Sequence, residues 1–326
     1  MTATVEAWKL DLLRCAVCGK KLIQAGSELR CAACNFKLAI SANIIIDPTI
    51  SSEEVDKNPY QTFMLSSRVQ TPYTTTARED SQYKEYVRKI VDSLNPDSSL
   101  IMDFGCGSGR FTKFLLSLGV KKVIAFDLSL PNLKMLERNL TTDELSKVIL
   151  LNATALRLSV APSCLDALFA IGVFHTLPRS QFKLACELTY SLLKPGGLLV
   201  NSDPTFEGAL IYALVCHDID EFKAVFKNST KAVNIRGEKS VRVQVYKPDE
   251  VEAILIESGF IPKEKHGISI FPSLIFGGVL PMKQVPEETR YELVNISDTL
   301  RFPQISASRV IIYVSEKRSF ATEKIL

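Results

Sequence analysis

A glycine-rich turn between a predicted strand and a predicted helix constrains the fold of this chain more than any other segment. The apolar run Leu100–Phe104 is followed by glycines at three alternate positions, Gly105, Gly107 and Gly109. The next residues place an apolar stripe on one helical face: Phe111, Phe114, Leu115 and Leu118. This pattern predicts a strand, a tight turn and a helix. The glycines let the backbone approach a ligand closely, because a Cβ atom would block it.

An acidic residue stands about 20 positions beyond the glycine turn. The apolar segment 123–126 reads as a second strand and ends in Asp127. In a βαβ unit, a carboxylate at this place accepts hydrogen bonds from ribose hydroxyls. Neither a Lys-Ser/Thr pair nor a third, widely spaced glycine follows the turn, so P-loop and dinucleotide sites are disfavoured. The pattern favours a nucleoside that carries no phosphate.

These residues resemble motif I and the ribose-binding acidic residue of the class I S-adenosylmethionine (SAM) methyltransferases. The resemblance implies SAM as the cofactor and methyl transfer as the activity. That family usually has an acidic residue at the position of Asn152, where it contacts the adenine amino group. Asparagine can accept the same hydrogen bond through its carbonyl but brings no charge. The cofactor-binding residues implied by the resemblance are Asp103, Gly105, Cys106, Gly107, Gly109, Asp127, Leu128, Asn152 and Ala153.

From Leu100 onward, predicted strands and helices alternate, which indicates a mostly parallel sheet with helices on both faces. We therefore expect an α/β fold, with a Rossmann-like, doubly wound methyltransferase sheet of seven strands preceded by a small zinc ribbon. The expected catalytic domain covers residues 78–326, with an insertion at 206–245. The strands are expected at 100–104, 123–127, 148–151, 166–171, 198–201, from 260 onward and at 309–314.

Four cysteines near the N-terminus, Cys15, Cys18, Cys31 and Cys34, form two C-x-x-C pairs. Each pair can present two thiolates to one tetrahedral ion, so the sequence predicts a structural zinc ribbon over residues 1–48. Such a small module needs its ion to fold, and four thiolate ligands leave no open position for catalysis. The rival interpretation, two disulfides, requires an oxidising compartment. Residues 49–77 are expected to form a linker that folds over the active site.

The predicted ribbon also indicates which kinds of partner the protein could bind. It resembles the zinc-ribbon fold of the small activator subunit that partners several tRNA and protein methyltransferases. It is also similar to the N-terminal zinc module of bacterial ribosomal-RNA guanine-N1 methyltransferases. Between positions 9 and 40, six basic residues stand against two acidic ones. This bias suits either RNA phosphate or a solvated docking face.

Two residues are candidates for a proton acceptor in catalysis. The segment 172–178 follows the fourth predicted strand and is similar to that of small-metabolite methyltransferases, in which a histidine often stands at the position of His175. Ligands bind at the carboxyl ends of strands in open α/β sheets, so His175 could act as general base, orient substrate or cap a helix. Asp203 closes the fifth strand at the same rim and is the second candidate, although an Asp before Pro204 also forms turns.

The motifs exclude some acceptors. No Asn/Asp-Pro-Pro-aromatic motif follows the fourth strand, as expected for adenine-N6 methylation, and no cysteine is placed for cytosine-C5 methylation. Two activities remain: methylation of an O or N atom on a small, partly apolar metabolite, and N-methylation of a ribosomal-RNA base with the ribbon binding RNA. A catalytically inactive SAM-binding partner is a third hypothesis.

Composition sets broad limits on class and location. The chain has 326 residues, of which 46% are hydrophobic and 23% charged, as in ordinary folded proteins. Its net charge of +3 is too small to indicate nucleic acid by itself. No secretory signal is evident, and the longest apolar tract, 268–282, is broken by proline and glycine. We expect a cytoplasmic protein without a membrane partner, and the sequence predicts no oligomeric state.

Overall fold

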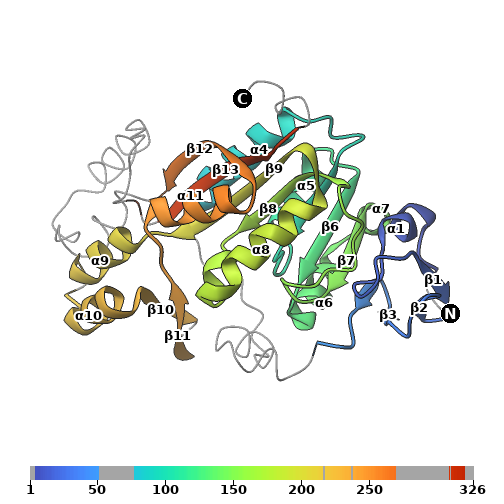
Figure 1. Cartoon of the computed structure of the whole chain (residues 1–326), viewed down its shortest axis with the longest axis horizontal. Coiled ribbons are helices and arrows are strands. Elements are labelled where there is room, and N and C mark those ends of the chain that lie inside the picture. Colours follow the sequence, from blue (N-terminus) through green and yellow to red (C-terminus); the bar gives the residue numbers. More distant parts are fainter. Residues whose placement is uncertain are drawn as a thin grey trace.

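One large mixed β-sheet organises the molecule (Figure 1). The computed structural model describes residues 4–50, 77–215, 217–235, 238–268, 308 and 310–319. The part of the sheet predicted from sequence runs in the order β7-β6-β5-β8-β9-β13-β12. All neighbours from β7 to β9 are parallel, and β13 is antiparallel to both β9 and β12. The bounds are β5 (Leu100–Phe104), β6 (Lys122–Asp127), β7 (Val148–Asn152), β8 (Leu165–Ile171), β9 (Leu193–Pro204), β12 (Phe260–Ile268) and β13 (Val310–Lys317).

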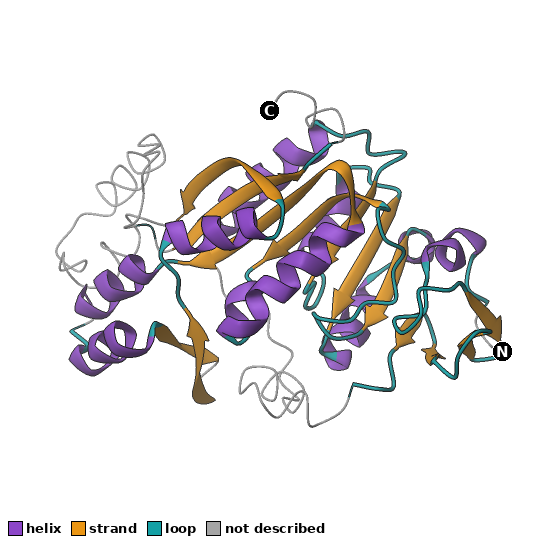
Figure 2. Ribbon diagram, in the orientation of Figure 1, coloured by secondary structure: helices purple, strands orange, loops and turns teal. Residues whose placement is uncertain are grey.

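Helices cover both faces of this sheet (Figure 2). Side chains of α4 (Ala77–Asp92), α5 (Arg110–Ser117) and α6 (Leu130–Asn139) pack in one buried cluster, and those of α8 (Arg179–Leu192) and α11 (Pro248–Glu257) pack in another. The short helix α7 (Thr142–Ser146), which starts with a capping box, precedes β7. The predicted doubly wound α/β fold is therefore confirmed.

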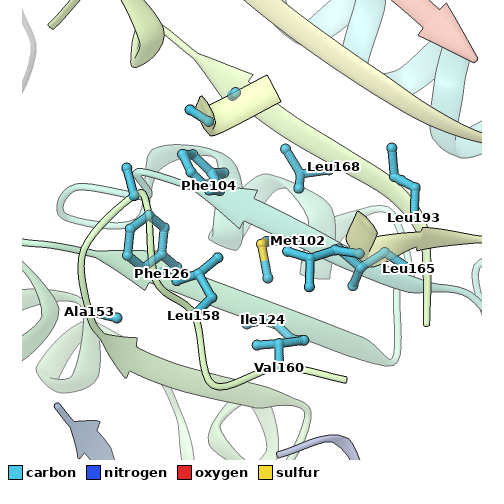
Figure 3. Close-up of a cluster of buried hydrophobic side chains, with 14 of the residues drawn as sticks. Met102, Phe104, Ile124, Phe126, Ala153, Leu158, Val160, Leu165, Leu168 and Leu193 are labelled. Carbon is cyan, nitrogen blue, oxygen red and sulfur yellow. The ribbon is translucent and has the colours of Figure 1, made fainter. Parts of the chain in front are cut away.

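The central strands contribute side chains to both clusters, because successive residues of a strand point to opposite faces. Ile101 and Val123 lie in the cluster with α4–α6, whereas Met102, Phe104 and Phe126 lie in the other. Figure 3 shows the last three side chains gathered on one side of their strands. The strands read as continuous apolar runs because both faces are covered.

The N-terminal ribbon continues the same sheet. It consists of α1 (Ala7–Leu12), β1 (Leu22–Ala25), β2 (Glu28–Cys31), β3 (Lys37–Ser41) and β4 (Ile44–Ile46). Strand β4 pairs in parallel with β7, so the seven predicted strands become part of an eleven-stranded sheet. An uncovered β7 would expose a row of unpaired backbone groups, and β4 covers that edge.

The predicted insertion forms a separate group of elements at the far end of the sheet from the ribbon (Figure 1). It contains α9 (Phe206–Val215), α10 (Ile219–Asn228), and a hairpin of β10 (Thr230–Ile235) and β11 (Glu238–Gln244). Most of the predicted linker and the apolar tract beyond residue 268 lie outside the described residues. No helix of the described chain is both long and apolar enough to cross a membrane.

Candidate active site

The glycine turn joins β5 to α5 and has positive φ at all three glycines. A Cβ built on Gly105 would lie 2.5 Å from Val173 Cγ2, and one on Gly109 would lie 2.2 Å from Leu136 Cδ1. Both distances are far below van der Waals contact. A Cβ on Gly107, by contrast, would meet no described atom within 4 Å. Two glycines therefore allow the turn to pack against its neighbours, and the middle one faces open space in which a ligand can approach the backbone.

Asp127, at the end of β6, lies against this turn. Its Oδ2 accepts a hydrogen bond from the Gly107 N–H at 2.7 Å, and its Oδ1 accepts one from the Ser129 N–H at 2.7 Å. Burial raises the pKa of the Asp127 carboxyl to about 6, although the two N–H donors oppose the shift. Each carboxylate oxygen has a second lone pair. The group therefore retains the capacity to accept hydrogen bonds from ribose hydroxyls.

Asp103 stabilises the glycine turn through a hydrogen bond to α5. It is 3% exposed, and its Oδ2 accepts a hydrogen bond from Thr112 Oγ1 at 2.6 Å, which links β5 to the first turn of α5. Burial raises the pKa of the Asp103 carboxyl to about 6. The neighbouring Cys106 thiol is also buried, and burial raises its pKa. Among these, Thr112 is the residue that sequence reasoning missed, because a lone threonine in a helix gives no signal.

Asn152, at the end of β7, is fixed by its side-chain amide. Its Nδ2 donates to the carbonyls of Asp127 at 3.0 Å and Leu128 at 2.8 Å, and Ala153 N–H donates to the Asp127 carbonyl at 3.4 Å. A carboxylate at position 152 would face these two carbonyl oxygens and repel them. The structure therefore gives a physical reason for the departure from the family pattern. Within the described chain, Asn152 Oδ1 has no hydrogen bond and can accept one.

The two predicted proton acceptors lie next to each other. His175 lies in the short helix η1 (Phe174–Thr176) after β8, and Asp203 lies near the end of β9. Their Nδ1 and Oδ1 atoms are 3.6 Å apart, slightly longer than a hydrogen bond, and neither atom has another partner in the described chain. The side chains are 14% and 1% exposed. A small rotation of the imidazole would form a His–Asp hydrogen bond.

Two further polar residues surround this pair, and sequence reasoning missed both. Asn201 donates from Nδ2 to Asp203 Oδ2 at 2.7 Å, which fixes the carboxylate. The Tyr246 hydroxyl is buried without a hydrogen-bond partner among the described residues. Burial and the nearby Asp203 raise the pKa of Tyr246. Asn201 had the signal of a polar residue two places before Asp203 on a buried strand, whereas Tyr246 follows the insertion and had none.

The four cysteines converge at the tip of the ribbon, with all four Sγ atoms within 4.8 Å of one another. Three of the Sγ–Sγ distances are 3.5, 3.4 and 3.8 Å. Tetrahedral coordination at a Zn–S distance of about 2.3 Å requires sulfurs about 3.8 Å apart, so the cluster fits zinc. Backbone N–H groups donate to two sulfurs, Val17 to Cys15 and Ala33 to Cys31, each at 3.4 Å. The Ala33 donor lowers the pKa of the Cys31 thiol to about 7, whereas the close approach of the four thiols raises the pKa values of Cys18 and Cys34.

Comparisons with known proteins agree with this arrangement. Residues 101–197 match the family model described as a methyltransferase domain. An uncharacterized methyltransferase of Geobacillus kaustophilus is 28% identical over 131 residues, which are 39% of this chain and 59% of that protein. A similar protein of Oceanobacillus iheyensis is 25% identical over 133 residues, 40% of this chain and 60% of its own length. The chain thus covers about three fifths of the length of these relatives.

Solved structures share the architecture at low sequence identity. The Burkholderia thailandensis 1,6-didemethyltoxoflavin-N1-methyltransferase, solved with that compound and S-adenosylhomocysteine bound, has a TM-score of 0.52 at 14% identity and covers 87% of this chain and 96% of its own. A Pyrococcus horikoshii protein has a TM-score of 0.51 at 14% identity, with 79% and 99% covered. Strand order and glycine turn are those of the class I methyltransferase fold, and residues 101–197 match a methyltransferase domain. The chain combines this domain with an N-terminal four-cysteine ribbon.

Proposed function

We propose that the protein transfers a methyl group from SAM to an O or N atom of a small, partly apolar metabolite. The observation that carries this proposal is the pairing of the half-buried His175 with the buried Asp203 at the carboxyl ends of β8 and β9, beside the glycine turn. A paired base is useful only when the acceptor must lose a proton, as hydroxyls, phenols and ring N–H groups do. Holding donor and acceptor in line supplies most of the remaining acceleration.

His175, Asp203 and Asn201 have separate roles in the proposed methyl transfer. When bound, SAM supplies an electrophilic methyl group on a positively charged sulfur. His175 would take the acceptor proton on Nε2 as the acceptor atom is methylated. Asp203 holds Nδ1–H and stabilises the imidazolium, as a carboxylate does when it orients a catalytic histidine. Asn201 fixes Asp203 through its own hydrogen bond.

The ribbon gives little support to the alternative, methylation of a ribosomal-RNA base. Most of its basic side chains have partners within the chain: Arg30 and Lys37 pair with Glu28, and Lys21 pairs with Asp11. The Lys9 ammonium is buried and donates to the Leu145 carbonyl at 2.7 Å. Three strands separate β4 from β8, which places the ribbon edge about 19 Å from the acceptor residues at a spacing of about 4.8 Å per strand. A small acceptor at His175 would not touch it.

The protonation of Asp127 should control cofactor binding. Its pKa is raised from 3.8 to about 6, and only the ionised carboxylate accepts from both ribose hydroxyls. Affinity for S-adenosylhomocysteine should therefore fall as the pH is lowered through about 6, by about tenfold for each further pH unit. Titration calorimetry between pH 5 and pH 8 measures this, and a constant affinity would contradict the assignment of Asp127.

The stability of the unliganded protein should depend on pH in the opposite direction from the ligand affinity, and increase as the pH is lowered. Because the raised pKa values of Asp103 and Asp127 make the folded state bind more protons than the unfolded state, stability falls as pH rises from about 4 to about 6. Melting temperatures over the same pH series provide the comparison. Parallel changes in stability and affinity would show that the affinity loss is merely unfolding.

Tritiated SAM distinguishes the two acceptor classes directly. The purified protein is incubated with labelled SAM and lysate from cells lacking its gene, and counts are partitioned among RNA, protein and organic extract. The proposal predicts label in the organic extract that depends on the added protein. Label in ribosomal RNA would instead overturn the metabolite proposal and assign the ribbon a part in substrate binding.

A further inference from the structure

Segment 152–161 begins with Asn152, the predicted adenine contact. The ribbon contacts the start of this segment. The Asp47 N–H, immediately after β4, donates to the Asn152 carbonyl at 2.9 Å. Ile46 is the register partner of Asn152 in the parallel β4–β7 pair. The backbone that carries the Asn152 side chain is therefore held by the last strand of the ribbon.

The Asp47 side chain holds the middle of the same segment. It is 2% exposed, and its Oδ2 lies 3.3 Å from Arg157 Nε. Its Oδ1 accepts hydrogen bonds from Thr49 N–H at 2.9 Å and from Thr49 Oγ1 at 2.6 Å. Arg157 in turn donates to Thr49. A buried carboxylate with a guanidinium partner is strongly destabilising to break, so this contact fixes the segment firmly.

The end of the segment pairs with the chain that leads into the metal cluster. Leu13 and Val160 form an antiparallel bridge. Arg14 N–H donates to the Ser159 carbonyl at 3.1 Å, and the Ala161 N–H donates to Leu12 at 2.8 Å. The next residue after Arg14 is the first cysteine ligand, Cys15. The four-cysteine cluster is therefore connected to segment 152–161 through the single peptide bond between Arg14 and Cys15.

We propose that the metal-loaded ribbon forms part of the cofactor site, with Asp47 as a positioning residue for Asn152. Zinc would link the two C-x-x-C turns. The first turn, Cys15–Cys18, follows the Arg14–Ser159 contact, and the second, Cys31–Cys34, precedes β3 and β4. Metal loading thereby holds segment 152–161 in place and keeps Asn152 Oδ1 available to the adenine amino group. The inference rests on the proposed function, because it concerns the affinity of the SAM site.

The positioning role is tested with two nucleosides and two variants of the zinc-loaded full chain. S-adenosylhomocysteine can donate its amino group to Asn152 Oδ1, whereas S-inosylhomocysteine carries a carbonyl there. We expect Asp47→Ala to weaken S-adenosylhomocysteine binding about tenfold, the loss of about one hydrogen bond, and to change S-inosylhomocysteine binding little. Asp11→Ala, at an exposed ribbon carboxylate paired with Lys21, should change neither. Equal weakening for both nucleosides would show general structural damage and overturn the positioning role.

Metal removal provides a second test of the same inference. Zinc is removed with a chelator under reducing conditions, and hydrogen exchange is followed in peptides covering 152–161 and β13. Exchange should accelerate in 152–161 and stay unchanged in β13. Unchanged exchange in 152–161, with unchanged S-adenosylhomocysteine affinity, would overturn the proposal.

The outcomes separate this inference from the proposed function. If the zinc-loaded protein bound neither nucleoside, the proposed function would fail, and the exchange data would still decide whether the ribbon positions the segment. Asp47→Asn, which keeps the side-chain volume, replaces Asp47→Ala if the latter fails to fold. Zinc content and melting temperature are measured for every variant.

Discussion

Replacing Asp127 with alanine should reduce the affinity for S-adenosylhomocysteine by roughly 100-fold or more, because hydrogen bonds to a charged group contribute about 1.5–3 kcal/mol each and two are lost. The substitution also removes the acceptor of the Gly107 and Ser129 N–H groups, so the glycine turn loses its support. Isothermal titration calorimetry measures the affinity. The effect should be present at pH 7.5, where the native carboxyl is ionised, and shrink toward pH 5.

A matched control separates this effect from a general change in charge. Asp143 lies in the first turn of α7, where its side chain is 76% exposed and pairs with Lys147. Asp143→Ala should leave the affinity unchanged. An Asp127→Ala protein that is folded and retains wild-type affinity would remove Asp127 from the cofactor site.

Replacing His175 with alanine should lower the rate of methyl transfer by about 10²- to 10⁴-fold, the range typical of a lost general base. The affinity for S-adenosylhomocysteine should hardly change, because the imidazole serves the acceptor and not the cofactor. Single-turnover rates with the acceptor identified from the tritium experiment provide the measurement. An unchanged rate would show that His175 only orients substrate or supports η1.

Asp203→Asn should produce nearly the same loss with the packing intact. Asn201 donates to Oδ2 of Asp203, so the new amide would turn its oxygen toward Asn201 and its nitrogen toward His175. The His175 Nδ1 would then accept a hydrogen bond, which leaves the proton on Nε2 and removes the base. His266→Ala is the control, since His266 pairs with Glu264 on β12, and it should react at the wild-type rate.

The catalytic domain was largely predictable because its signals are local. The bounds of Leu100–Phe104 agree with the structure, since an apolar strand buried on both faces ends at a glycine turn. The fifth strand was expected at 198–201, and the structure extends it in both directions, as β9 from Leu193 to Pro204. Residues 194–197 form an irregularity in the pairing, since β8 pairs with Leu193 and then with Leu198 onward.

Long-range contacts could not be predicted in this way. The pairing of β4 with β7 joins residues about a hundred positions apart in the chain, so no local pattern indicates it. His175 and Asp203 were each recognised as candidates, and only the parallel pairing of β8 with β9 brings them together. The orientation of the Asn152 side chain likewise depends on the backbone carbonyls of Asp127 and Leu128, at and just after the end of β6, which no residue pattern reveals.

Titration of the zinc-loaded wild-type protein with S-adenosylhomocysteine tests the central claim most directly. The account predicts saturable binding at one site per chain, lost in Asp127→Ala and preserved in Asp143→Ala. Absence of binding by the folded, zinc-loaded protein at pH 7.5 would contradict the assignment of the glycine turn as a SAM site.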